Sequence, residues 1–358
     1  MAVCPMWKRR DFLKCGLLAG VTVSAARRAY SARTVDLVRE SVVIDMLGLL
    51  TLDWAKLDRW QREAGAFDSG AFQKLSESGV TVFHPAVDLH APRPFEAIRD
   101  WAVNWNAFIG RYPDDFLRVD GPADFAHAKS GGKAGIILGL QNSDHFRTVE
   151  DVAFFYGLGQ RVSQLTYNSQ NSIGAGCGVA HDSGLTDYGA QVVGEMNRIG
   201  MAVDISHTGD RTSLDAIHLS KKPVLITHSN CRALNPHRRC KPDDIIRAMA
   251  AGGGVMGITS IRSFVGGRER ATIEDVLDHF GHVAKIAGIE HVGVGSDNDV
   301  DGGDGGRPAR HIDIAGLDGP QRIFNLTEGL MRRGYSNRDI RLILGGNFQR
   351  ALSEIWAA

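Results

Sequence analysis

Residues 201–228 read MAVDISHTGDRTSLDAIHLSKKPVLITH, and this stretch decides the fold. Two near-continuous apolar runs, 201–207 and 223–228, enclose a more polar segment. Such runs are typical of parallel strands that are buried on both faces. Between them, Asp210 can cap a helix from Thr212 to Leu219. A strand, a helix and a second parallel strand form one βαβ unit.

The same alternation of apolar runs and amphipathic segments extends over the chain. One helix is expected over Thr186 to Ile199, and Pro242 is expected to open another over Asp243 to Ala251. Eight alternations predict an α/β fold of the (β/α)8 TIM-like barrel type. The predicted strands are Val42–Leu50, Val80–Val87, Ala134–Gln141, Val162–Tyr167, Met201–His207, Pro223–His228, Gly254–Ser260 and His291–Asp297.

One domain is expected over residues 33–358, because no Pro-, Gly- or Ser-rich linker divides the chain. The glycine-rich stretch 301–306 is interpreted as a mobile loop after the last strand. Residues 1–32 have the features of a twin-arginine signal peptide: Lys8-Arg9-Arg10, an apolar run over 16–26, and small residues around Ala29, Ser31 and Ala32 that a signal peptidase could cut. The apolar run is shorter than the roughly 20 residues that span a bilayer. We therefore expect a partnership with the twin-arginine export machinery, cleavage of this segment and a periplasmic location.

Composition excludes several classes of protein. The 358 residues are 43% hydrophobic, with 41 Lys+Arg and 41 Asp+Glu, which suits a globular core and offers no basic face for nucleic acid. Removing residues 1–32, with six basic side chains and one acidic one, leaves 35 basic against 40 acidic side chains, a net charge of −5. The five Cys form no C-x-x-C pair, although a disulfide between Cys231 and Cys240 stays open.

Three of the predicted strands end in a histidine or an aspartate: His207, His228 and Asp297. In a (β/α)8 barrel the carboxyl ends of the strands line the active site. Each histidine alone would more often be a hydrogen-bonded core residue, but imidazole and carboxylate groups from three strands at one rim suit Zn²⁺ with an open position for water. His84, in the apolar run of the second strand, could replace a lost ligand, although a single rim histidine is more often a wall residue.

Several strings carry a family resemblance. They are 184–186 (GLT), 192–201 (VVGEMNRIGM), 203–207 (VDISH), 223–229 (PVLITHS) with Arg238-Arg239 after it, 291–297 (HVGVGSD) and 346–350 (GNFQR). Together they resemble the membrane dipeptidase (renal dipeptidase) family of zinc peptidases, from about Val42 to the C-terminus. The resemblance implies a barrel of the metal-dependent hydrolase type that cleaves short peptides, typically dipeptides, at two zinc ions bridged by a glutamate and a hydroxide. The resemblance is also compatible with a homodimer.

Four positions match the family by resemblance. His207 and His228 match the two histidines of the second zinc, and Arg239 matches the arginine that holds the substrate carboxylate. Asp297 matches the aspartate of the eighth strand, beside the metals and the attacking water.

Other positions depart from the family. Its His-x-Asp at the end of strand one falls on Leu47 and Leu49, which cannot bind a cation. Its bridging glutamate falls on Gln141, and its substrate-contacting histidine on Tyr167. An amide oxygen carries no charge, so Gln141 is at best a weak ligand. One zinc ion is therefore expected rather than two.

Three chemistries stay open. In the first, zinc at His207, His228 and Asp297 activates water for peptide hydrolysis, Arg239 binds the peptide carboxylate, and Tyr167 polarises the scissile carbonyl or stabilises the oxyanion. In the second, His207, His228 and Asp297 act as metal-free acid–base groups on a modified peptide. In the third, the barrel only binds a peptide. Fold alone does not choose between them. We expect the first.

Overall fold

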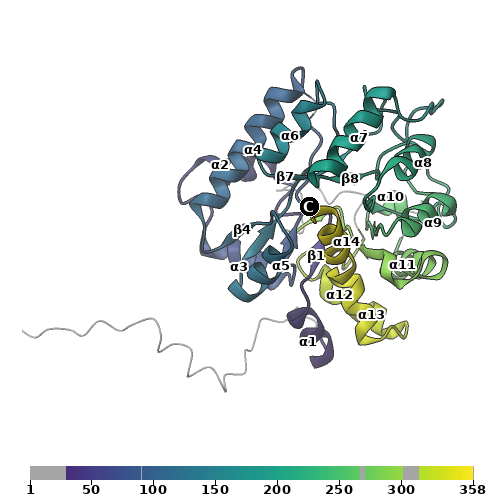
Figure 1. Ribbon diagram of the computed structural model, residues 1–358. Coiled ribbons are helices and arrows are strands. Elements are labelled where there is room, and N and C mark those ends of the chain that lie inside the picture. Colours follow the sequence, from purple (N-terminus) through teal and green to yellow (C-terminus); the bar gives the residue numbers. More distant parts are fainter. Residues whose placement is uncertain (1–29, 90, 267–270, 301–313, 358) are drawn as a thin grey trace, which may run out of the picture.

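Eight parallel strand positions form a ring. The computed structural model describes residues 30–89, 91–266, 271–300 and 314–357. Each strand pairs with the next one along the chain, β8 and β9 meet through a bridge between Asp204 and Leu225, and the last strand pairs with the first. In ring order they are β1 (Ile44–Asp45), β3 (Val82–Phe83), β5 (Ala134–Ile136) continued by β6 (Leu138–Leu140), β7 (Gln160–Gln164), β8 (Ala202–Asp204), β9 (Ile226–Ser229), β10 (Met256–Ile258) and β11 (Val292–Val294). The predicted barrel is confirmed (Figure 1).

Three short strands lie outside this ring. β2 (Gly48–Leu49) pairs with β12 (Asn298–Asp299), just beyond β1 and β11. β4 (Phe116–Arg118) pairs with β5 and was not predicted. It has three residues, of which only Phe116 is fully buried, so its sequence lacks the apolar run that marks the other strands.

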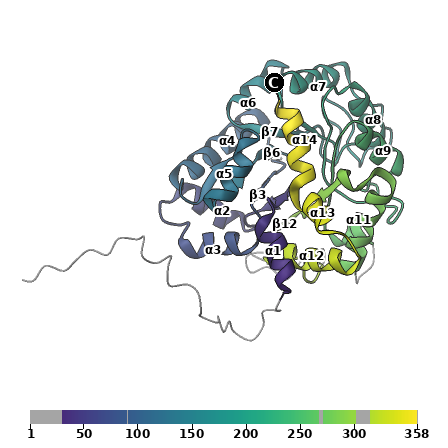
Figure 2. The ribbon, with the colours of Figure 1, turned by 60° about the horizontal axis from the view of Figure 1, so that its bottom comes forward.

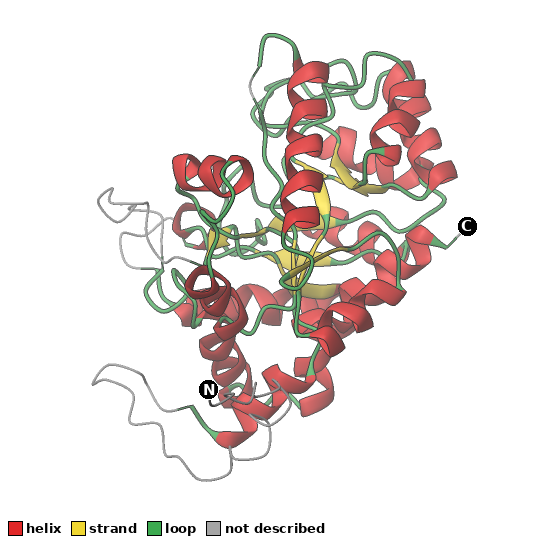
Figure 3. Ribbon diagram, turned by 90° about the vertical axis from the view of Figure 1, so that its left-hand side faces the viewer, coloured by secondary structure: helices red, strands yellow, loops and turns green. Residues whose placement is uncertain are grey.

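Helices surround the strands (Figures 2 and 3). They are α1 (Ala32–Glu40), α2 (Trp54–Arg62), α3 (Ser69–Glu77), α4 (Pro94–Arg111), α5 (Ala123–Gly131), α6 (Glu150–Gly157), α7 (Asp187–Ile199), α8 (Asp210–Leu219), α9 (Asp243–Ala251), α10 (Arg262–Val265), α11 (Ile273–Ala287), α12 (Arg322–Arg332), α13 (Asn337–Arg341) and α14 (Asn347–Trp356). Within the described ranges, none of them is both long and apolar enough to cross a bilayer.

The N-terminal capping residues of three helices can be compared with those expected from the sequence. Thr186 caps α7 as its side chain accepts the N–H of Gly189. The expectation that Asp210 caps α8 is wrong, because Gly209 holds the cap position and Asp182 accepts the N–H groups of the first turn from a distant loop. Pro242 stands at the cap position of α9, one residue before the first helical position.

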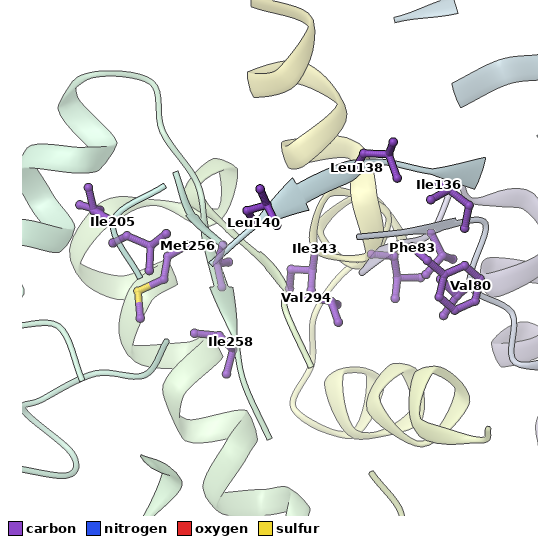
Figure 4. Close-up of a cluster of buried hydrophobic side chains, with 14 of the residues drawn as sticks. Val80, Phe83, Ile136, Leu138, Leu140, Ile205, Met256, Ile258, Val294 and Ile343 are labelled. Carbon is purple, nitrogen blue, oxygen red and sulfur yellow. The ribbon is translucent and has the colours of Figure 1, made fainter. Parts of the chain in front are cut away.

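Two apolar layers hold the barrel. The outer layer lies between strands and helices, and Figure 4 shows Ile136, Met256 and Val294 within it. The inner layer contains alternate strand residues such as Val82 and Ala202, packed against Phe348 and other residues of α14. Arg350 of α14 donates to Gly253 O, just before β10. α14 therefore covers the N-terminal ends of the strands, opposite the predicted site.

Some predictions fall outside the described residues. They are the signal segment up to residue 29 and the glycine-rich loop 301–306. Ser31, predicted to lie near the cleavage site, is described and caps α1 by accepting the N–H of Thr34. Cys231 and Cys240 are both buried and free, so the disulfide that their spacing left open is not formed.

Candidate metal and peptide site

Two histidines meet at the carboxyl ends of neighbouring strands. His207 follows β8, His228 lies in β9, and both are buried. Their Nε2 atoms are 3.1 Å apart. The ring of Tyr167, from the end of β7, stacks on His207 with a centroid separation of 4.1 Å and an interplanar angle of 22°. The structure therefore brings together three of the predicted site residues.

Hydrogen bonds at the far side of each ring orient the two histidines. His207 Nδ1 lies 2.8 Å from Asn168 Oδ1, which accepts its hydrogen. His228 Nδ1 lies 2.8 Å from Thr227 Oγ1, and the Thr227 hydroxyl donates its own hydrogen to Asp204 Oδ2 at 2.7 Å. Thr227 must then accept from His228, because a hydroxyl has only one hydrogen. Both Nδ1 atoms carry a hydrogen, so the two Nε2 lone pairs face each other.

The two rings are neutral in the folded protein. Burial, followed by the positive charge of Arg239, lowers the pKa of His207 and of His228 well below the ordinary histidine value. A shared proton between the Nε2 atoms is therefore unfavourable near pH 7. Two neutral imidazoles with converging lone pairs are the state of histidine that binds metal ions.

Asp204 anchors this arrangement and was not among the predicted site residues. Besides the Thr227 hydroxyl, its carboxylate accepts the N–H of Thr227 at 3.0 Å and the hydroxyl of Ser206 at 2.6 Å. It thereby joins the ends of β8 and β9 behind the histidines. The signal in the sequence was a single carboxylate within the apolar run of residues 201–207.

Arg239 is buried close to the histidine pair. Its two terminal nitrogens donate to Ser206 O and to His228 O, each at 2.6 Å, and its Nε has no hydrogen-bond partner. Within the described ranges, no carboxylate forms an ion pair with this guanidinium. A buried cation with an unused N–H is suited to bind an anion that enters the site.

Asp297 follows β11 with a left-handed backbone, φ 60°. Its N–H donates to Leu47 O at 2.9 Å, which fixes the turn to the end of the first strand. Its negative charge acts on two other predicted site residues. It helps burial to raise the pKa of Tyr167, and it partly offsets the lowering of the pKa of Arg239 by burial. Aspartate is one of the few residues other than glycine that tolerate this region of φ/ψ space.

The family model of "Membrane dipeptidase (Peptidase family M19)" matches residues 33–358. The chain belongs to the membrane dipeptidase family. It is 37% identical over 254 residues to dipeptidase verJ of Clonostachys rogersoniana, covering 70% of this chain and 63% of that protein. It is 38% identical over 199 residues to an uncharacterized dipeptidase of Schizosaccharomyces pombe, covering 53% and 48%. The chain thus matches less than two thirds of the length of these curated relatives.

A solved structure is also similar. The amidohydrolase from Pseudomonas aeruginosa shares 30% identity with this dipeptidase-family chain, with a TM-score of 0.79 over 90% of this chain and 99% of that one. The matched region includes most of the barrel, which agrees with the ring of strands described above.

The predicted metal ligands do not come together as one group. Within the described residues, no group of three or more His, Cys, Asp or Glu side chains is placed to hold a metal ion. The predicted set of His207, His228 and Asp297 is therefore not assembled as one group, and the histidine pair stands without Asp297. At the end of the first strand, Leu47 and Leu49 are buried apolar residues.

Gln141 forms hydrogen bonds with residues of neighbouring segments. Its amide nitrogen donates to Ala86 O at 3.1 Å, and its backbone carbonyl accepts from the Gln164 amide. This amide is held by the neighbouring segment after β3. No contact joins it to the histidine pair within the described hydrogen bonds, so its predicted role as a weak ligand stays a prediction.

His84 lies inside the barrel as a wall residue. Its Nδ1 donates to Met46 O at 2.7 Å, and a Cβ at Gly139 would come within 2.0 Å of its Nε2. Glycine at that position makes room for the ring. Burial lowers the pKa of His84, and its Nε2 has no hydrogen-bond partner. It belongs to no group of ligands among the described residues.

Proposed function

We propose that this protein hydrolyses dipeptides or short peptide-like substrates at a single zinc ion bound by His207 and His228. The observation that carries the proposal is the pair of Nε2 lone pairs that face each other at 3.1 Å. Membership of the membrane dipeptidase family supports the same reaction class. The sequence departures at Leu47 and Leu49 support one ion in place of two.

The two histidine nitrogens are close enough together to bind one zinc ion. A Zn–N bond is about 2.0–2.1 Å, and the separation of the two nitrogens is less than twice that length, so one ion can contact both. Histidine ligands in zinc enzymes usually donate their other ring nitrogen to an outer partner. Asn168 and Thr227 are such partners here. A bound zinc ion would supply a Lewis acid and a nucleophilic water near neutral pH.

Arg239 would bind the terminal carboxylate of the peptide. The guanidinium is buried, and charge-assisted hydrogen bonds are stronger in such a site than in water. Because Ser206 O and His228 O already hold its terminal nitrogens, the guanidinium is fixed before a substrate arrives. A fixed donor loses little entropy on binding, which favours orientation of the substrate.

Asp297 and Tyr167 would carry out the proton chemistry. Asp297 would accept the proton of the attacking water. The raised pKa of Tyr167 keeps its hydroxyl protonated near pH 7, so it can donate to the scissile carbonyl oxygen as negative charge develops there. Stacking on His207 places the phenol ring beside the histidine pair.

Hydrolysis assays with chelation and zinc replacement separate the three chemistries. For zinc-dependent hydrolysis we expect activity on dipeptides that a chelator removes and zinc restores. His207→Ala should abolish that activity, whereas His218→Ala, a change at an exposed histidine of α8, should not. Activity that survives chelation but is lost in Asp297→Asn would indicate the metal-free acid–base enzyme. No turnover of any peptide, with a ligand-dependent rise in Tm, would indicate a binding barrel.

We also propose export to the periplasm by the twin-arginine route, supported by the arginine pair and short apolar run in residues 1–32. A reporter fused to these residues should be exported, and replacing Arg9 and Arg10 by lysine should stop export. Equal export of the two fusions would contradict the proposal.

A further inference from the structure

Lys241 is a buried lysine that the proposed chemistry does not use. Its side chain is almost wholly inaccessible. Nζ donates to Thr208 O at 2.6 Å and to Ser213 Oγ at 3.0 Å. Within the described ranges no carboxylate forms an ion pair with it. Burying an ammonium without a counter-ion is unfavourable, and an apolar side chain of similar length would fill the same space without that cost.

The carbonyl that Lys241 binds lies immediately after His207. The carbonyl immediately before His207 belongs to Ser206, and it accepts from Arg239 at 2.6 Å. Two buried basic side chains therefore donate hydrogen bonds to the backbone on both sides of one proposed zinc ligand. Both come from the same short segment, where they are separated only by Cys240.

That segment is itself attached to the strand of the other histidine. The backbone N–H of Lys241 donates to Asn230 O at 2.8 Å, and Ser229 Oγ donates to Arg239 O at 3.0 Å. Arg239 also donates to His228 O at 2.6 Å. Residues 239–241 thus link the end of β9 to the end of β8, and the side chain of Lys241 completes the link at Thr208.

We propose that Lys241 is a positioning residue for the zinc site: by fixing Thr208 O it holds the turn that carries His207, and so keeps His207 Nε2 against His228 Nε2. The inference rests on the proposed function and extends it. Lys241 touches neither the metal nor the peptide, and it acts through the backbone beside His207.

The test compares zinc affinity in four proteins. They are the wild type, Lys241→Met, Lys241→Arg and the control Lys222→Met, whose lysine also donates to two backbone carbonyls, Glu354 O and Ala357 O, but at the opposite end of the barrel. Zinc binding is measured by competition with a chromophoric chelator. We expect Lys241→Met to weaken zinc binding about 10- to 100-fold, as is usual for outer partners of metal ligands. Lys241→Arg should restore most of the affinity, and Lys222→Met should match the wild type.

A second readout does not need the metal. Ring-nitrogen NMR of histidine-labelled, metal-free protein reports the tautomer and hydrogen bonding of His207. We expect Lys241→Met to change the His207 signals and Lys222→Met to leave them unchanged. Wild-type zinc affinity and His207 signals in Lys241→Met would overturn the inference. If the wild type binds no zinc, the proposed function fails, and the NMR comparison still tests the positioning role. If Lys241→Met does not fold, Lys241→Gln, whose side chain is one bond shorter, replaces it with the same expected results.

Discussion

Nε2 of His207 lies 3.1 Å from Nε2 of His228, and the hydrogen bonds behind each ring turn both lone pairs toward the gap between them. Two neutral acceptors at this separation repel each other unless a cation or a proton lies between them. Burial and the charge of Arg239 oppose the proton. The pair is therefore arranged for a metal cation, and this relationship is the basis of the proposed chemistry.

Thr227→Val tests the outer hydrogen bonds of this pair. The change keeps the shape of the side chain but removes the acceptor for His228 Nδ1 and one donor to Asp204. We expect zinc affinity to fall about 10- to 100-fold. The free energy of unfolding should fall by about 1–3 kcal/mol, because a buried carboxylate loses a donor. Thr327→Val is the control: this buried hydroxyl donates to Ile323 O within α12, far from the histidines in the chain. An unchanged zinc affinity in Thr227→Val would argue against the assigned tautomer.

Substitutions of Asp297 should have different effects on the free energy of unfolding and on kcat. Asn tolerates the left-handed backbone as well as Asp does, so Asp297→Asn should change the free energy of unfolding by less than about 0.5 kcal/mol. The same change should lower kcat about 10²- to 10⁴-fold, because it removes the proposed base. Asp297→Ala should also lose activity but should be less stable than Asp297→Asn by about 1–2 kcal/mol, since alanine is strained in this region. Chemical denaturation and steady-state kinetics measure the two effects. Near-normal kcat in Asp297→Asn would remove Asp297 from the mechanism.

Arg239 should bind the terminal carboxylate of the substrate. We expect Arg239→Lys to raise KM for a free dipeptide about 10- to 100-fold, the equivalent of one charged hydrogen bond of about 1.5–3 kcal/mol. A dipeptide amide lacks that carboxylate, so the wild type should cleave it poorly and the substitution should matter little. Equal loss of activity on the free and amidated peptides would show that Arg239 acts by holding Ser206 O and His228 O alone.

The stability of the protein should fall in acid, in part through His145. This residue is buried against Phe146 and Phe155, and burial lowers its pKa to about 3. The unfolded chain, with a pKa near 6.5, binds more protons than the folded protein between these values. The free energy of unfolding should therefore decrease as pH falls from about 6.5 toward 3, by up to a few kcal/mol.

A substitution isolates this contribution of His145. His145→Phe should flatten the pH dependence in the same range, whereas the exposed His218 replaced by Phe should not. Urea denaturation at several pH values gives the comparison. An unchanged slope in His145→Phe would mean that other groups cause the acid lability.

The sequence predicted the barrel well because its strands are near-continuous apolar runs. Each of the eight predicted strands overlaps a strand of the ring, although β7 begins two residues before its prediction and β9 ends one residue after it. β4 was not predicted, because only Phe116 of its three residues is fully buried. The cap of α8 was misassigned, since the acceptor is Asp182, 30 residues from the Thr212 N–H that it binds. Local sequence cannot show a cap that comes from a distant loop.

The candidate site was predicted in part. The rule that strand ends line the site led to His207 and His228, and the resemblance added Arg239 and Tyr167. The orientation of the rings depends on Asn168, Thr227 and Asp204, and Lys241 reaches Thr208 across 33 residues. These contacts arise only when neighbouring strands are paired in register. They depend on the folded barrel and cannot be predicted from the order of residues along the chain.

Zinc binding to metal-free protein shows whether His207 and His228 form a metal site. Titration of the wild type, His207→Ala and His228→Ala by calorimetry gives the stoichiometry and affinity in one experiment. We expect about one tightly bound zinc ion per wild-type chain and loss of that site in either variant. Less than about a tenth of an equivalent bound to the folded wild type, or the same tight site in both alanine variants, would contradict it.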